Sequence, residues 1–221
     1  MPAGTAQIKE AFWSIQGEGA RHGVPSVFVR FGGCNLRCAF CDTDFLNGLT
    51  TYTVDTLVAE VQRLAGPTRS LIVTGGEPLL YQPFLASFLG ALKRADSAWY
   101  IAVETNGTQA LQPDCGLLID WVCCSPKDLA ALALTHADEV KVVFTHDFRR
   151  WITEAPHHIT ADYYYVSPEA YHANPYSVRA SARPGHYLEE VRQPIHDVLA
   201  FIQEHPQWRL NLQLHKILAL P

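Results

Sequence analysis

Three thiols fall within eight residues in the segment Gly32-Gly33-Cys34-Asn35-Leu36-Arg37-Cys38-Ala39-Phe40-Cys41-Asp42-Thr43. Their number is informative, because a structural zinc site normally closes with a fourth cysteine or histidine. An iron-sulfur cubane held by three thiolates instead leaves one iron open to a ligand from outside the protein. The alternatives are a zinc site completed by a histidine such as His22, or three unrelated buried cysteines. The close spacing favours a cluster on Cys34, Cys38 and Cys41.

The composition limits the class of protein. The 221 residues, 48% of them hydrophobic, suffice for one sizeable core, so we expect a single domain over residues 1–221. A net charge of −5 without a lysine or arginine run argues against direct binding to nucleic acid. No stretch approaches the roughly 20 apolar residues that span a bilayer, and residues 1–4 begin no secretion signal. We therefore expect a soluble, cytoplasmic protein with no membrane partner, whose six cysteines are explained by metal binding or burial.

Apolar runs that suit strands alternate with segments that suit helices. Most of these runs are nearly continuous, as in parallel strands that are covered on both faces. The strand runs are Val27–Phe31, Leu71–Thr74, Trp99–Val103, Leu117–Cys123, Val140–Phe144, Tyr163–Ser167 and Arg209–Leu214. The helical segments are Val54–Leu64, Gln82–Arg94, Phe148–Glu154 and Pro194–His205. The alternation predicts repeated βα units of an α/β fold, with the chemistry in the loops after the strands.

Glycines and polar residues follow several of the strand runs. The second run continues as Leu71-Ile72-Val73-Thr74-Gly75-Gly76-Glu77-Pro78. Paired glycines let the backbone approach a ligand closely, and Glu77 can accept a hydrogen bond from an ammonium group. A strand-to-helix turn with Pro78 at the first helical position explains the same residues without any ligand. Two later runs end in Cys124-Ser125-Pro126-Lys127 and Tyr165-Val166-Ser167-Pro168, which by themselves read as turns.

The cysteine segment resembles the signature of the radical S-adenosylmethionine (SAM) superfamily, with three and then two intervening residues and an aromatic residue before the last cysteine. The resemblance implies a partial (βα) barrel with about six core parallel strands and an incomplete helix layer. It also implies a four-iron four-sulfur cluster whose open iron chelates SAM, with the glycine turn at the methionine amino group. The residues that it implies for cofactor binding are Ala39, Phe40, Cys41, Gly75, Gly76, Glu77, Ser125, Pro126, Lys127 and Ser167.

Three further features resemble one family, the 7-carboxy-7-deazaguanine synthases. They are Phe12-Trp13-Ser14-Ile15-Gln16-Gly17-Glu18-Gly19, the pair Asp42-Thr43, and Asn211-Leu212-Gln213-Leu214-His215-Lys216-Ile217-Leu218-Ala219-Leu220-Pro221. The resemblance implies that Thr43, in the cluster loop 32–43, binds Mg²⁺ beside the substrate, and that a C-terminal tail 209–221 closes the active site. The implied substrate contacts are Ile15, Gln16, Gly17, Arg30, Thr74 and Pro221, with Glu104 and His215 as catalytic polar groups. Without the resemblance, a glycine-rich hairpin, a helix N-cap and a docked terminal strand explain the three features.

The resemblance also implies a reaction and its partners. A 5′-deoxyadenosyl radical from SAM would abstract hydrogen from C6 of 6-carboxy-5,6,7,8-tetrahydropterin, and ring contraction with loss of ammonia would give 7-carboxy-7-deazaguanine. Such a lyase serves the biosynthesis of queuosine and other deazapurines. A flavodoxin or ferredoxin as electron donor and a homodimeric assembly are implied as well. The alternatives are a glycyl-radical activase, which would not explain Gln16–Gly19, and a non-enzymatic iron-sulfur or zinc carrier.

The other three cysteines carry no clear metal signature. Cys123 and Cys124 are adjacent near a strand end and therefore point to opposite faces, while Cys115 stands beside a Pro-Asp turn. We interpret all three as small hydrophobic residues, with an auxiliary cluster as the alternative. We expect residues 167–193 to form an irregular segment without a regular helix or strand. The part from Tyr171 to Tyr187 matches no feature of the family.

Overall fold

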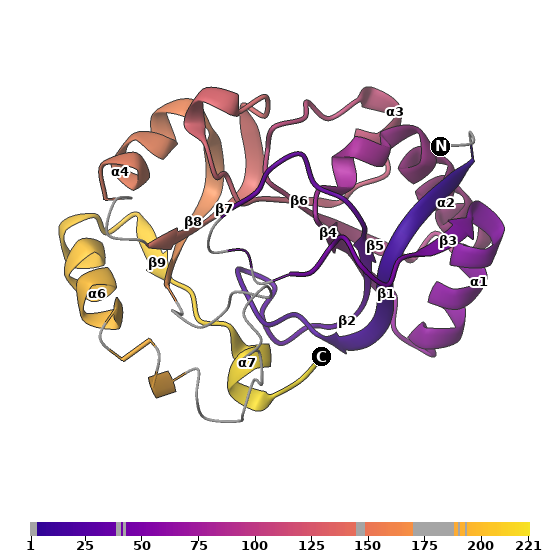
Figure 1. The fold of residues 1–221 in the computed structure, drawn as a ribbon, viewed down its shortest axis with the longest axis horizontal. Helices are drawn as coiled ribbons and strands as arrows, with labels where there is room; N and C mark the ends of the chain where they lie inside the picture. The colour runs from indigo at the N-terminus through magenta and orange to yellow at the C-terminus, as the bar shows by residue number, and fades with distance from the viewer. Residues whose placement is uncertain are drawn as a thin grey trace.

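A single mixed sheet forms the centre of the protein (Figure 1). The computed structural model describes residues 4–38, 41, 43–144, 149–169, 188–189, 191–192 and 194–221. The described strands are β1 (Thr5–Ile15), β2 (Pro25–Phe31), β3 (Thr50–Thr53), β4 (Ser70–Gly75), β5 (Tyr100–Thr105), β6 (Trp121–Cys124), β7 (His136–Phe144), β8 (Thr160–Pro168) and β9 (Trp208–Leu210). The helices are α1 (Val54–Ala65), η1 (Pro78–Tyr81), α2 (Gln82–Ala95), α3 (Pro113–Gly116), η2 (Leu129–Ala131), α4 (Arg149–His158), α6 (Pro194–Glu204) and α7 (Leu214–Leu218). The predicted α/β fold is thus confirmed.

The parallel part of the sheet runs from β2 to β9 in the order β2-β4-β5-β6-β7-β8-β9. It has one strand more than the predicted six, and each predicted strand run overlaps one of these strands. Strands β7 and β8 begin at His136 and Thr160, before the predicted Val140 and Tyr163, and two other predicted boundaries are wrong because the chain turns. The run from Leu117 begins as a strand only at Trp121, because α3 and a turn precede it and leave Leu117 86% exposed. The last run ends as a strand at Leu210, because the chain then turns toward the β1–β2 loop.

The two antiparallel strands were not predicted from the sequence. β1 pairs with both β2 and β3, and its register with β2 shifts between Ile8 and Glu10. Such a bulge interrupts the alternation of buried and exposed residues on which a strand prediction depends. β3 has only four residues, and it is a largely exposed edge strand. Neither strand therefore presents a regular apolar pattern.

Helices pack on one face of the sheet and form two hydrophobic clusters. α1 begins at Thr53, whose side chain forms a capping box with Thr56, and it buries Leu57 and Val61 on one face. α1 and α2 pack with β1, β2, β4 and β5 in one cluster, whereas α4 and α6 pack with β7 and β8 in the other. Figure 1 shows the two helix pairs at opposite ends of the sheet. Among the described helices, none has the length and apolar character needed to cross a membrane.

On the face opposite the helices, the side chains of the parallel strands change from apolar to polar toward the carboxyl ends of the strands. Phe28 pairs in register with Ile72, and Ile72 with Ala102, and all three are buried. Side chains two residues further along a strand point to the same face. Arg30 and Thr74 occupy those positions, as one register pair, near the carboxyl ends of β2 and β4. The polar residues of this face are therefore gathered at the strand ends, where sites of α/β proteins lie.

Candidate active site

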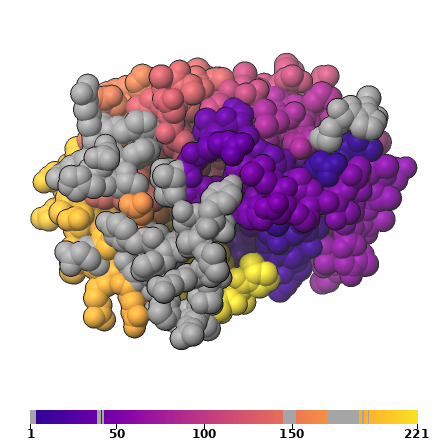
Figure 2. Space-filling view, in the orientation of Figure 1, coloured from indigo at the N-terminus to yellow at the C-terminus, as the bar shows by residue number. Residues whose placement is uncertain are grey.

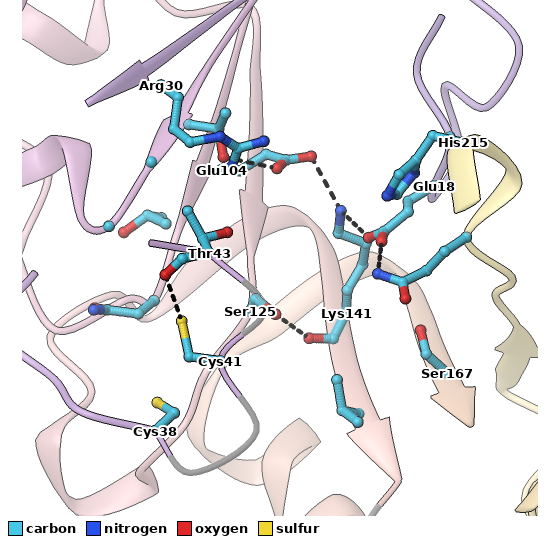
Figure 3. Close-up of a pocket in the computed structure, with 18 of the residues that line it drawn as sticks. Glu18, Arg30, Cys38, Cys41, Thr43, Glu104, Ser125, Lys141, Ser167 and His215 are labelled. Atoms are coloured by element: carbon cyan, nitrogen blue, oxygen red, sulfur yellow. Dashed lines mark hydrogen bonds and ion pairs between the residues drawn. The ribbon is translucent and has the colours of Figure 1, made fainter. Parts of the chain in front are cut away.

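A cavity of about 390 Å³ lies at the carboxyl ends of the parallel strands (Figure 3). The predicted residues that line it are Ile15, Gln16, Gly17, Arg30, Cys34, Cys38, Cys41, Thr43, Thr74, Gly75, Gly76, Glu104, Ser125, Lys127, Ser167, His215 and Pro221. Glu77 and Pro126 do not belong to the described lining, and Ala39, Phe40 and Asp42 lie outside the described residues. The fold therefore brings together segments from the first strand to the C-terminal residues.

The three cysteines of the cluster loop are half-buried, free thiols on the cavity wall. Cys34 Sγ accepts N–H bonds from Leu36 at 3.4 Å and from Asn106 Nδ2 at 3.8 Å, and such donors stabilise a thiolate. Burial raises the pKa of Cys34 and Cys38, so a metal must displace their protons. No three acidic, His or Cys side chains of the described residues converge as the ligands of one ion do. A cubane does not need this convergence, because each thiolate binds a different iron, and the donor set fits it.

The glycine turn after β4 is held directly against the cluster loop. Gly76 N donates to Phe31 O at 3.0 Å, and Glu77 N donates to Gly33 O at 2.9 Å. Gly75 has a φ of +145°, a conformation that favours glycine. The two glycines thus bring the backbone to the cavity wall, as predicted from their pairing.

The side chain of Glu77 is bound within the protein. Its carboxylate is fully buried, and accepts from Leu79 N at 2.9 Å, Thr105 Oγ1 at 2.8 Å and Asn106 N at 2.7 Å. Burial raises the pKa of Glu77, although these three donors oppose the effect. The side chain therefore fastens the turn to the end of β5, and its expected contact with SAM stays a prediction.

A buried ion network crosses the cavity floor. Lys141 Nζ donates to Glu18 Oε2 at 2.8 Å and to Glu104 Oε1 at 3.1 Å (Figure 3). Burial by itself would raise the pKa of Glu18, but the Lys141 ammonium together with His215 and Gln213 outweighs burial and holds that pKa far below its usual range. The same ammonium lowers the pKa of Glu104 against burial and the charge of Glu18. Burial would lower the pKa of Lys141, but nearby Cys123, Glu104 and Glu18 raise it. All three charges are therefore maintained at neutral pH.

The C-terminal residues line the cavity beside the β1–β2 loop. Leu214 N donates to Gly17 O at 3.0 Å, and Gly19 N donates to Asn211 Oδ1 at 2.8 Å. A side chain at Gly17 would overlap the ring of His215, so this glycine permits the close approach. Figure 2 shows the C-terminal residues, in yellow, at the surface beside the N-terminal ones, in indigo.

Comparisons with known proteins agree with this geometry. A family model described as the radical SAM superfamily matches residues 28–114. A 7-carboxy-7-deazaguanine synthase of Bacteroides thetaiotaomicron is 36% identical over 97% of this chain and 98% of its own length. One of Burkholderia multivorans is 35% identical over 98% of this chain and all of its own length. The chain belongs to the 7-carboxy-7-deazaguanine synthase family. A crystal structure of QueE from Escherichia coli, 23% identical, covers 96% of this chain and 95% of that one with a TM-score of 0.69, which supports the same fold.

Membership of this radical SAM synthase family implies a four-iron four-sulfur cluster and SAM as cofactors. Around the SAM-binding residues expected by resemblance, Lys127 Nζ donates to Ser125 Oγ at 3.0 Å, and Ser125 Oγ donates to Lys141 O at 2.9 Å. Ser167 Oγ accepts from Asn211 Nδ2 at 2.8 Å. The bond from Ser125 to Lys141 holds the β6 end against β7, and the bond from Asn211 to Ser167 holds the β8 end against residue 211.

Two charged residues of the synthase site were not predicted. Lys141 lies within the apolar run of β7, where a single lysine between valines is a signal of a buried ion pair. Glu18 belongs to the quoted Gln16–Gly19 segment but was assigned no partner. Sequence gives the presence of these charges but not their pairing, because Glu18 and Lys141 come from separate strands and loops.

Substituting Glu77 with glutamine is expected to lower the free energy of unfolding by about 2 kcal/mol. Denaturant unfolding measures the effect. The control is Glu60→Gln on α1, whose ion pair with Arg63 is exposed and contributes less than about 1 kcal/mol. An equal loss in the two variants would contradict the structural role of Glu77.

Proposed function

We propose that this protein is a 7-carboxy-7-deazaguanine synthase, a lyase that converts 6-carboxy-5,6,7,8-tetrahydropterin into 7-carboxy-7-deazaguanine with loss of ammonia. The observation that carries the proposal is one cavity lined by the three-cysteine loop, the glycine turn, the Gln16–Gly19 segment and the C-terminal residues. Relatives of that name match nearly the full chain. The product would enter the biosynthesis of queuosine and other deazapurines.

The cofactors would be held by the cysteine loop and the strand ends. Cys34, Cys38 and Cys41 would bind the cluster, and SAM would lie along the backbone of Gly75 and Gly76. The end of β6, with Ser125, Pro126 and Lys127, and Ser167 at the end of β8 would contribute further contacts. When bound, the reduced cluster and SAM supply the 5′-deoxyadenosyl radical that removes hydrogen from the substrate. The protein residues themselves orient the substrate and exclude water from the radical.

The substrate would be held by polar groups on the concave face. Arg30 Nε donates to Glu10 at 2.8 Å, which fixes the planar guanidinium at the cavity wall for a substrate carboxylate. Glu104, kept ionised by Lys141, can accept only, and it would take N–H groups of the pterin ring. Gln16 and Thr74 donate to Glu104 and line the cavity with it. The other contacts would come from Ile15, Gly17, His215 and the carboxylate of Pro221.

A magnesium ion would lie between Thr43 and the substrate carboxylate. A threonine hydroxyl is a weak Mg²⁺ ligand by itself, because Mg²⁺ prefers anionic oxygen and loses its waters reluctantly. The location of Thr43 and Arg30 on one cavity wall supports a shared carboxylate ligand. We further expect residues 1–221 to act as one domain, in a cytoplasmic homodimer reduced by a flavodoxin or ferredoxin.

The decisive experiment is an anaerobic incubation of reconstituted protein with dithionite, SAM, Mg²⁺ and 6-carboxy-5,6,7,8-tetrahydropterin. Mass spectrometry should detect 7-carboxy-7-deazaguanine, and removal of Mg²⁺ by a chelator should reduce its rate. Formation of 5′-deoxyadenosine without this product would contradict the substrate and favour another radical SAM enzyme, such as a glycyl-radical activase. Absence of both compounds with an intact cluster would favour an electron carrier.

A further inference from the structure

One lysine joins an acid of the β1–β2 loop to an acid of β5. Lys141 is on β7, and its side chain is only 7% exposed. The two carboxylates that share its ammonium come from separate parts of the fold, Glu18 from the β1–β2 loop and Glu104 from β5. Figure 3 shows the Lys141 ammonium between them. A movement of Glu18 therefore changes the charge that Glu104 faces.

Glu18 also anchors the C-terminal segment, defined here as residues 211–218. Gln213 Nε2 donates to Glu18 Oε1 at 2.6 Å, while Glu18 Oε2 is the oxygen bound by Lys141. Each oxygen of Glu18 thus has its own partner, one on the segment and one on the sheet. The adjacent bond from Leu214 N to Gly17 O fastens the same two segments together. Displacement of the C-terminal segment therefore removes a partner of the carboxylate that binds Lys141.

The contacts that begin at Gln213 pass through Glu18 and Lys141 and end at Glu104, which lines the cavity. Its Oε1 accepts from Gln16 Nε2 at 3.0 Å and from Lys141, and its Oε2 accepts from Thr74 Oγ1 at 3.1 Å. These donors determine the plane of a carboxylate that remains 25% exposed and lines the cavity. Without Lys141, Glu104 and Glu18 would be neighbouring anions with no shared cation, and their repulsion would displace at least one of them.

We propose that Lys141 is a positioning residue that couples docking of the C-terminal segment to the orientation of Glu104 toward the substrate. The identity of that substrate rests on the function proposed above. With the segment docked, Gln213 holds one oxygen of Glu18 and Lys141 bridges Glu18 to Glu104. With the segment released, Glu18 is free to move and to draw the ammonium away from Glu104. By linkage, a substrate bound to Glu104 stabilises the docked segment to the same extent.

The first test measures hydrogen-deuterium exchange of the C-terminal segment in cluster-loaded protein without substrate. Lys141→Met removes the ammonium with little change in side-chain length, and makes no direct change in the segment. Exchange in residues 211–218 is expected to increase about tenfold, the factor for one charge-assisted hydrogen bond. The matched control is Lys93→Met on α2, whose ion pair with Asp120 lies outside the cavity lining. Unchanged exchange in Lys141→Met would overturn the proposal whatever the substrate proves to be.

The second test measures KM for 6-carboxy-5,6,7,8-tetrahydropterin in a double-mutant cycle. Lys141→Met and Gln213→Leu are each expected to increase KM, the first about tenfold. Gln213→Leu should add less than about twofold in the Lys141→Met background, because both changes interrupt one path. Effects that simply multiply would mean that Gln213 acts on the substrate independently of Lys141, and would overturn the coupling.

The two tests separate failure of the coupling from failure of the proposed function. If the wild-type protein does not convert the pterin, the proposed function fails, and the exchange experiment still decides whether Lys141 controls the segment. If Lys141→Met does not fold because it leaves two unpaired carboxylates, Gln213→Leu removes a neutral donor and provides the test. A wild-type KM and wild-type exchange in that variant would overturn the proposal.

Discussion

Replacing Cys38 with alanine is expected to reduce SAM cleavage to background. The three thiols of the loop line one cavity. An intact cubane has one iron without a protein ligand, and loss of one thiolate would leave two such irons. The measurement combines iron content and visible absorbance after anaerobic reconstitution with chromatography of 5′-deoxyadenosine after reduction by dithionite. Both cluster content and cleavage should fall, because cleavage requires the cluster.

The matched control for Cys38→Ala is Cys115→Ala. Cys115 is 1% exposed and packs in the hydrophobic cluster of α1 and α2, and burial raises its pKa to about 11. A buried neutral thiol of this kind is not a metal ligand, so this variant should retain the cluster and SAM cleavage. Full SAM cleavage in Cys38→Ala would show that the cluster assignment is wrong.

Substitution of Gly76 with alanine is expected to weaken SAM binding by at least about tenfold, equivalent to 1.4 kcal/mol. A Cβ atom at Gly76 would overlap the carbonyl oxygen of Gly33 and lie 2.9 Å from Cys34 Cβ. These are backbone and cluster-loop atoms, so the loop and the turn after β4 must separate. That separation would break the bond from Glu77 N to Gly33 O. Equilibrium binding of SAM to the reconstituted protein measures the effect.

A glycine in α2 provides the control for Gly76→Ala. At Gly90 the nearest atom to a new Cβ would be Arg94 Nη1 at 3.1 Å, the flexible end of a side chain. Gly90→Ala should therefore leave SAM affinity unchanged, and the loss of backbone freedom in the unfolded chain should stabilise the helix by up to about 1 kcal/mol. Wild-type SAM affinity in Gly76→Ala would contradict the close packing of the turn on the cluster loop.

The parallel strands could be predicted because their burial is nearly complete. Val27, Leu71 and Ile101 are all inaccessible to solvent, and strands covered on both faces are apolar without interruption. β1 could not be predicted in the same way, because its bulge interrupts the alternation of buried and exposed side chains. It pairs with β2 along one edge and with β3 along the other. The apolar run from Leu117 misled the strand prediction, since apolar residues in a turn can pack on a helix as well as on a sheet.

The candidate site was predictable where a short segment contains the whole pattern. The three cysteines and the paired glycines are such patterns, and all of them line the cavity. Glu77 shows the limit of this reasoning, because an acid after two glycines can face a ligand or fasten the turn. The bonds from Thr105 and Asn106, which lie far along the chain, show that it fastens the turn. The pairing of Lys141 with Glu18 has the same limit, since it depends on a contact between distant parts of the chain.

The contact of Asn211 and Leu214 with the β1–β2 loop also has a consequence for the order of events during synthesis of the chain. Ribosomes make the N-terminal part first, so the cysteines of residues 34–41 emerge long before the C-terminal residues that line the same cavity. A nascent chain that has reached β8 thus contains all three thiols but not the wall supplied by residues 211–214. Until those residues are added, the thiols face solvent, open to delivery of iron and sulfide and equally open to oxidants.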